Sequence, residues 1–171
     1  YKIAIVDKAN KEEEAKYWKD NFLKIKPCSD EFHHTKTFLN ITKTYVTEKM
    51  DEDFNVEKTD KIDILNRSVE YFKTNESFNK ADFEETVFQS EEVINSFRSY
   101  DSSYRESNEI EVKDEFDISD QAVKKQSKFF KSILKLDKNF HVYIHGNKDM
   151  IERGVESDGR KFYKIYFEKE D

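Results

Sequence analysis

The chain has 171 residues, with 30 Lys and Arg against 37 Asp and Glu, a net charge of −7 and an aromatic content of 15%. The 39% of charged residues would favour disorder, but fifteen Phe and nine Tyr supply enough bulky side chains for a folded core. Three Gly and one Pro exclude collagen-like and linker-like proteins, and a single Cys excludes an internal disulfide framework and a cysteine-based metal site. The longest apolar run, residues 3–6, is far shorter than the roughly 20 residues of a membrane helix.

The N-terminal residues favour a strand followed by a helix. Residues 1–7 are strand-like but have no strand partner nearby, so we expect residues 1–8 to be the tail of an upstream domain. A helix is predicted over residues 11–25, because apolar residues recur there at spacings of three and four. This stripe, predicted to be buried, consists of Ala15, Trp18, Phe22 and Ile25.

Three more helices complete a predicted helical region over residues 9–108. One begins at Ser29 or Asp30 and runs to about Met50, and the next covers residues 59–73. Another starts near Asn79 and continues past Phe97. The apolar faces of these helices contain Phe38, Ile41, Tyr45, Val46, Ile62, Leu65, Val69, Phe72, Phe83, Val87, Val93, Ile94 and Phe97. Residues 98–109 show no clear period and are predicted to be a loop or a frayed segment.

The last part of the chain, residues 109–171, is predicted to combine a helix with a small antiparallel sheet. Residues 109–112 alternate and favour a strand or an arm, and Ser119 is the N-cap of a helix running to about residue 131. The expected buried side of that helix contains Ala122, Val123, Phe129 and Phe130. Two hairpins follow, with turns at residues 137–139 and 157–159; in the first, Phe140, Val142 and Ile144 share the inward face. The fold class is therefore α+β, with this part and the helical region forming one compact unit.

The sequence contains no pattern typical of an enzyme, a metal site or a cofactor site. A phosphate-binding loop needs clustered glycines, which are absent, and Cys28 has no local nucleophile signature. His141 and His145 would lie about 13 Å apart on a strand, too far to ligate one metal ion. The acidic clusters lack the spacing of a calcium loop and are interpreted as solvated helix ends.

Charge is distributed unevenly along the chain, and this difference points to one candidate site. Residues 1–118 hold 18 cations against 28 carboxylates, whereas residues 119–171 hold 12 against 9. A lysine stripe is predicted on the helix after Ser119 and in the hairpin that follows, made of Lys124, Lys125, Lys128, Lys131, Lys135 and Lys138. Such a stripe suits contacts with the phosphates of double-stranded DNA, which need little geometric precision. The alternative is a solvated helix face, although the other predicted helices mix Glu among their lysines.

The same residues carry a resemblance to a known family. Residues 122–126, 130–146 and 158–166, together with 14–23 and 34–36, resemble the C-terminal portion of the bacterial 37-kilodalton nucleoid-associated proteins of the NdpA type. The resemblance implies a non-enzymatic, cytoplasmic protein of the nucleoid that associates with DNA. It supplies no catalytic residues and no residue-level DNA site.

Two functions fit these observations, and neither involves a membrane. One is weakly sequence-selective DNA association through the lysine stripe. The other is a docking or dimerisation module that binds nucleoid proteins, DNA-maintenance proteins or a second copy of the chain without touching DNA. The acidic first part favours this alternative, because a surface with a charge of −10 repels the duplex.

Overall fold

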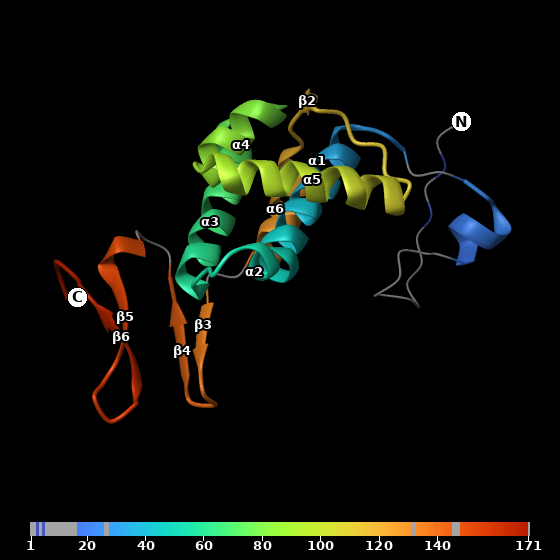
Figure 1. Cartoon of the computed structure of the whole chain (residues 1–171). Coiled ribbons are helices and arrows are strands. Elements are labelled where there is room, and N and C mark those ends of the chain that lie inside the picture. Colours follow the sequence, from blue (N-terminus) through green and yellow to red (C-terminus); the bar gives the residue numbers. More distant parts are fainter. Residues whose placement is uncertain are drawn as a thin grey trace.

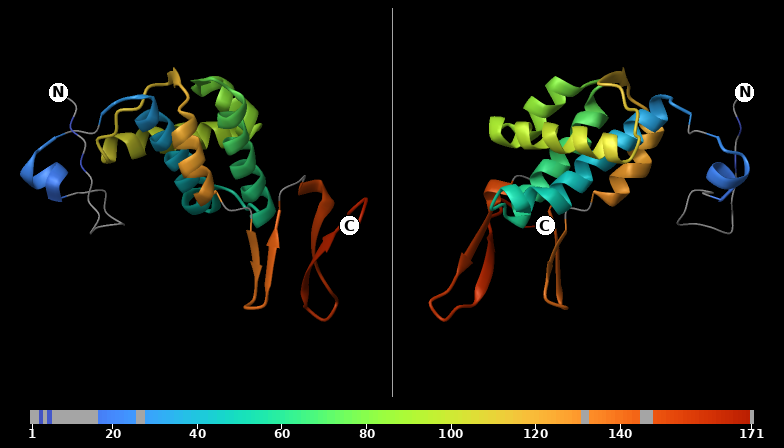
Figure 2. Two further views of the ribbon diagram at one scale, coloured as in Figure 1. Left: turned by 180° about the vertical axis from the view of Figure 1, so that it is seen from behind. Right: turned by 45° about the vertical axis from the view of Figure 1, so that its right-hand side comes forward.

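Helices form the main body of the molecule, and two β-hairpins extend from one end of it (Figures 1 and 2). The structure is a computed structural model and describes residues 3, 5, 17–25, 28–130, 133–144 and 148–170. Helices dominate and the sheets are small and antiparallel, which confirms the predicted α+β class. The strand expected over residues 1–7 lies outside the described residues, apart from Ile3 and Ile5, which are not in a strand.

The first two helices of the body begin where their capping residues predict. The N-cap Asp30 accepts a hydrogen bond from the His33 backbone N–H at 3.0 Å, and Glu57 and Asp60 form a capping box at the start of the next long helix. The elements of this half are α1 (Glu31–Thr44), the π-helical turn η2 (Tyr45–Lys49), α2 (Met50–Asp53) and α3 (Lys58–Thr74). The apolar residues predicted to face inward on α1, η2 and α3 are buried, so both sequence predictions are confirmed.

The helix expected to begin near Asn79 is two helices, which corrects the sequence prediction. Asn79 caps α4 (Lys80–Phe88), and Gln89 then adopts a left-handed backbone with φ of 61°, which ends that helix. A second helix, α5 (Glu91–Ser107), follows and lies across α1 and α3 (Figure 1).

Residues 98–107 are helical, so the loop predicted there is wrong. Phe97 and Asp101 are buried and Tyr100 and Tyr104 pack against the core, at helical spacings of three and four. A buried polar residue belongs to this face: Asp101 is 1% exposed and bonds to Lys80 and Arg105. Residues 97–104 therefore do have a helical periodicity of buried side chains, but the apolar residues alone do not reveal it.

A two-stranded sheet at the top of the body was not predicted. It pairs β1 (Ser77–Asn79) with β2 (Glu115–Asp117), and its central pair is Phe78 with Phe116. Residues 109–112, for which a strand or an arm was expected, are not in a strand. Three-residue strands are too short to show an alternating pattern, which is why this sheet was missed.

Helix α6 (Asp120–Gln126) and the two predicted hairpins make up the remainder. The 3₁₀ turn η3 (Ser127–Phe129) extends α6, and β3 (Ile133–Leu136) pairs with β4 (Phe140–Tyr143). After the 3₁₀ turn η4 (Lys148–Met150), β5 (Ile151–Val155) pairs with β6 (Lys161–Ile165). Both predicted turns are confirmed, and Gly159 provides the positive φ of 86° that the second turn needs. The hairpins are separate sheets in the described part, rather than one sheet.

Aromatic side chains fill the core of the helical body. Phe38 of α1 lies within 6.3 Å of four other phenylalanine rings, and Phe72 stacks on Phe78 at 5.3 Å. A smaller cluster of Ile62, Leu134 and Ile144 joins the foot of α3 to the first hairpin. These contacts connect the helices and the hairpins through apolar packing.

Four aromatic residues expected to be buried are exposed. Trp18 and Phe22, in the short π-helix η1 (Tyr17–Phe22), are 45% and 63% exposed and contact each other edge-on at 5.3 Å. Phe129 and Phe140 are 58% and 64% exposed. Phe129 is the last residue of η3 and Phe140 the first residue of β4, where neighbouring elements no longer cover the face predicted to be buried.

Candidate nucleic-acid interface

Helix α6 is fixed on the outside of the body by its N-terminal end. The Ser119 side chain caps it, and the Ser119 backbone N–H donates a hydrogen bond to Thr35 Oγ1 of α1 at 3.0 Å. Ala122 and Val123 are buried beneath it, as the sequence predicted. Further along both segments, Lys43 of α1 lies over the Phe129 ring. Because Thr35 precedes Lys43 and Ser119 precedes Phe129, α1 and α6 run in the same direction.

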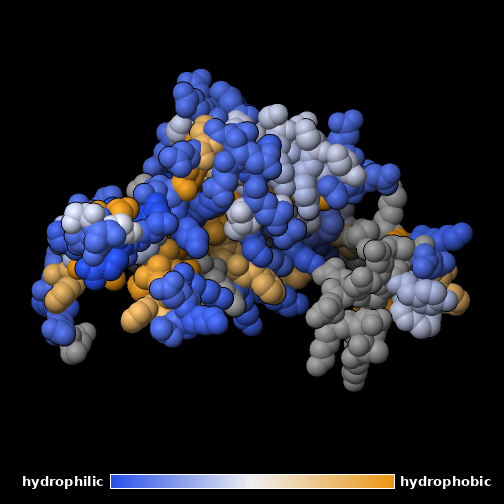
Figure 3. Space-filling model, turned by 60° about the horizontal axis from the view of Figure 1, so that its bottom comes forward, coloured by the Kyte–Doolittle hydropathy of each residue, from blue (hydrophilic) through white to orange (hydrophobic). Residues whose placement is uncertain are grey.

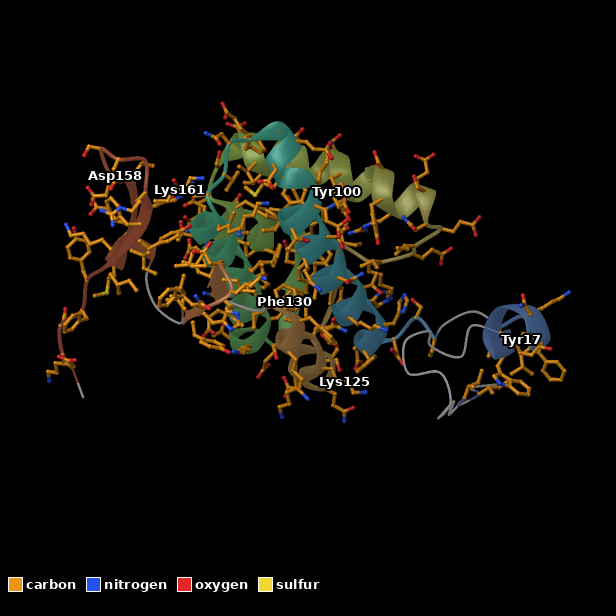
Figure 4. The ribbon with its side chains drawn as sticks, turned by 90° about the horizontal axis from the view of Figure 1, so that it is seen from below. Tyr17, Tyr100, Lys125, Phe130, Asp158 and Lys161 are labelled. Carbon is orange, nitrogen blue, oxygen red and sulfur yellow. The ribbon has the colours of Figure 1, made fainter. Side chains whose placement is uncertain are left out.

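The buried face of α6 determines which side chains point outward. Lys124, Lys125 and Lys128 are exposed, and Figure 4 shows Lys125 projecting from α6 away from the body while Phe130 lies within it. Lys125 Nζ lies 5.0 Å from the centre of the Phe32 ring of α1, a cation–π contact that leaves the charge near solvent.

The lysine stripe continues into the first hairpin in the structure. Lys135 and Lys138 are exposed, on β3 and in the turn before β4, while Lys131 lies outside the described residues. Lys135 lines a hollow between the two hairpins, whereas the α6 lysines lie on the surface of the body. Five of the six predicted residues are therefore exposed in the structure, on α6, on η3, on β3 and in the turn before β4.

None of these five lysines forms an ion pair with a carboxylate in the part of the chain that the structure describes. Many carboxylates of the helical body, by contrast, are already paired with its own cations. Asp101 bonds to Lys80 and Arg105, and Glu84 accepts a hydrogen bond from Arg98 Nε at 2.7 Å. The ammonium groups of these five lysines are thus available to an external anion.

One cation of this surface was not predicted. Lys43 Nζ lies 5.5 Å from the centre of the Phe129 ring, which brings a half-buried lysine of α1 beside the end of α6. Residues 43 and 129 are distant in the sequence, so no local pattern could have connected them. The exposed Phe129 is part of this contact, and Figure 3 shows further apolar side chains among the hydrophilic ones on the lower face of the molecule.

The histidine and acidic groups considered from the sequence do not form a metal site in the described residues, where no three His, Cys, Asp or Glu side chains gather suitably. His34 is 3% exposed, and its Nε2 lies 3.1 Å from Ser29 Oγ. Burial lowers the pKa of His34 below its ordinary value, helped by the neighbouring charge of His33. His145 lies outside the described residues.

Comparison with known proteins identifies the family. A family model described as nucleoid-associated protein YejK matches residues 1–159, which is most of the chain. The chain belongs to the nucleoid-associated protein YejK family. This confirms the resemblance to nucleoid-associated proteins found in the sequence. No curated protein and no solved structure shows significant similarity to the chain.

None of the helices that the structure describes has the length and apolar character needed to cross a bilayer. The exposed lysines of α6 and the first hairpin form a positively charged surface that attracts anions.

Proposed function

We propose that this YejK-family chain associates with double-stranded DNA through the phosphate backbone, with little sequence selectivity. The contacts are made by a lysine stripe consisting of Lys124, Lys125, Lys128, Lys131, Lys135 and Lys138. The observation that carries the proposal is the exposure of the five described lysines, none of which pairs with a described carboxylate. Lys131 is included in the stripe only because its sequence spacing from Lys124 and Lys128 is that of one helix face.

The chemistry of the stripe supports backbone contacts over base recognition. Ammonium groups on flexible stems bind phosphates as point charges, whereas reading of base edges relies on Arg, Asn and Gln presented in the major groove. Helix α6 presents lysines on its exposed surface, and Ala122 and Val123 on its other side are buried against the body. Lys43 of α1 adds one cation beside this surface.

This function places the protein in the nucleoid of the bacterial cytoplasm, in a non-enzymatic role. Membership of a nucleoid-associated family supports the location, and no group of His, Cys, Asp or Glu suited to a metal ion lies among the described residues. The acidity of the first part of the chain confines the duplex to the side of α6 and the first hairpin.

Titration with duplex DNA at two salt concentrations tests the proposal. If about five phosphates are neutralised, raising the salt from about 50 to about 200 mM weakens binding on the order of 10²–10³-fold. Fluorescence anisotropy of a labelled duplex measures this change. Binding that is insensitive to salt would contradict a phosphate-driven interaction.

The second candidate function is a docking or dimerisation module without DNA contact. Exposed apolar side chains on and beside the hairpins favour it: Phe140 and Tyr143 on β4, and Ile165 and Phe167 at and after the end of β6. Its partners would be nucleoid or DNA-maintenance proteins, or a second copy of the chain. In that case the titration shows no DNA affinity at either salt concentration, and sedimentation reports whether the chain self-associates.

A further inference from the structure

A hollow of about 770 Å³ opens where the foot of the helical body meets the two hairpins. Its lining comes from three places in the sequence: the junction of α2 with α3, the β3–β4 turn, and the facing side of the β5–β6 hairpin. Tyr163, which lines the hollow, also packs with Ile151 against the buried cluster of Ile62, Leu134 and Ile144. The hollow is therefore built by packing that holds the two hairpins against α3.

Cations outnumber carboxylates in the lining by five to three, with Lys58, Lys61, Lys135, Arg153 and Lys161 against Asp51, Glu57 and Asp137. Two ion pairs neutralise part of this charge. Lys61 Nζ lies 2.6 Å from Asp51 Oδ2, and Arg153 Nη1 lies 3.4 Å from Glu57 Oε1.

Three lysines keep their charge available to the hollow. Lys58, Lys135 and Lys161 form no ion pair with any described carboxylate, and they come from α3, β3 and β6. The β5–β6 register pairs Val155 with Lys161 and Arg153 with Tyr163, which puts all four side chains on one face of the hairpin. Figure 4 shows Lys161 on the side of the hairpin toward the helical body.

The geometry points to a binding site for a phosphorylated ligand in this hollow, and we propose that it takes the phosphate groups of a nucleotide. Lysines from three separate elements line one space, an arrangement that suits a compact polyanion. The ligand is either a free nucleotide or a nucleotide of a DNA strand that reaches the hollow; in the second case the inference rests on the proposed function.

Substitution of Asp137 provides a test in which phosphate binding is expected to become stronger. Its carboxylate lines the hollow without an ion-pair partner among the described residues, so it repels a phosphate there. Its backbone has φ of 51°, a conformation that Asn adopts readily. Asp137→Asn thus removes a negative charge while keeping the shape of the turn.

The experiment titrates the full chain with dATP in the absence of metal and, separately, with a 20-base-pair duplex, using calorimetry and anisotropy. The variants are the double substitution Lys58→Gln with Lys161→Gln, and Asp137→Asn. Lys73→Gln is the matched control, since Lys73 is exposed on the same helix as Lys58 but about 22 Å along its axis. Thermal unfolding of each variant verifies that the exposed substitutions leave the fold intact.

A free nucleotide is the ligand if dATP binds, the double variant weakens it about tenfold or more, and Asp137→Asn strengthens it. A DNA strand is the ligand if dATP does not bind but the duplex responds in those two directions. The proposal is overturned if the hollow variants change neither affinity beyond the change seen in Lys73→Gln. Lys124 and Lys128 do not line the hollow, so reversing their charges tests the lysine stripe separately, and either proposal can fail alone.

Discussion

The backbone N–H of Ser119 donates a hydrogen bond to Oγ1 of Thr35 at 3.0 Å, across 84 positions of the sequence. Thr35 is fully buried on α1, and Ser119 is the N-cap of α6. This contact ties the start of α6 to α1, while the buried Ala122 and Val123 determine which residues of α6 face solvent.

Thr35→Val removes this acceptor while keeping the shape of the side chain. The Ser119 N–H then has no partner at a half-buried site, so we expect the free energy of unfolding to fall by about 1–3 kcal/mol. Thr44→Val is the control, because the Thr44 hydroxyl bonds only to Asn40 of its own helix and is exposed. Urea denaturation measures both variants, and an equal effect in the two would contradict the importance of the contact.

Asp101→Asn tests the buried ion-pair network between α4 and α5. The Asp101 side chain is 1% exposed and receives Lys80 on one oxygen and Arg105 on the other. Removing its charge weakens both pairs, while Lys80 keeps Glu84 at 4.0 Å and Arg105 keeps Asp114 at 3.2 Å. We therefore expect a loss of about 1–3 kcal/mol in unfolding free energy.

The comparison is Glu52→Gln, which breaks the exposed Lys49–Glu52 pair. Exposed pairs contribute at most about 1 kcal/mol, so this variant should unfold nearly as the natural chain does. Similar losses in Asp101→Asn and Glu52→Gln would show that burial does not govern the strength of the network.

Phe97→Ala tests the aromatic core. Phe97 is fully buried and contacts the rings of Phe38, Tyr45 and Phe88, so its truncation leaves a cavity. The expected loss is about 3–5 kcal/mol in a denaturation experiment. Trp18→Ala, which truncates a 45% exposed ring, should cost far less, and a large loss there would mean that the η1 segment packs against the body.

His34 makes stability depend on pH. Burial lowers its pKa in the folded state, so below its ordinary pKa of about 6.5 the unfolded chain binds a proton more readily than the folded chain. The free energy of unfolding therefore decreases as the pH falls from 7.5 through 6.5 toward the folded pKa. In His34→Gln this contribution is absent, so its stability should fall less between pH 7.5 and 5.5. The same fall in both proteins would contradict a buried neutral His34.

Sequence patterns predicted well those elements whose signals are local. The caps at Asp30 and Ser119, the apolar period of α3 and the turn at Gly159 each depend on residues a few positions apart. The helix break at Gln89 has no glycine or proline to mark it. The helical face of α5 includes the buried Asp101, whose burial is explained only by cations on other parts of the chain.

The candidate site was predicted only in part. The spacing of lysines along one helix does not show which side chains neighbouring elements bring to the same surface. The exposure of Lys124, Lys125 and Lys128 follows from the buried Ala122 and Val123, which the period identifies. Lys43 beside Phe129 and the position of Lys135 in the hollow depend on contacts between distant segments. The boundaries proposed for residues 1–8, 9–108 and 109–171 remain predictions.

The most direct measurement is duplex binding by the double variant Lys124→Glu with Lys128→Glu, compared with Lys73→Glu combined with Lys169→Glu. Both pairs change the net charge equally, but only the first pair lies on α6 and the η3 turn that extends it. We expect the α6 reversal to lower affinity by about 100-fold or more at low salt and to reduce the salt slope by about 2, with the control close to the natural chain. Equal weakening by both pairs, or unchanged binding after the α6 reversal, would contradict the lysine stripe as the DNA-binding surface.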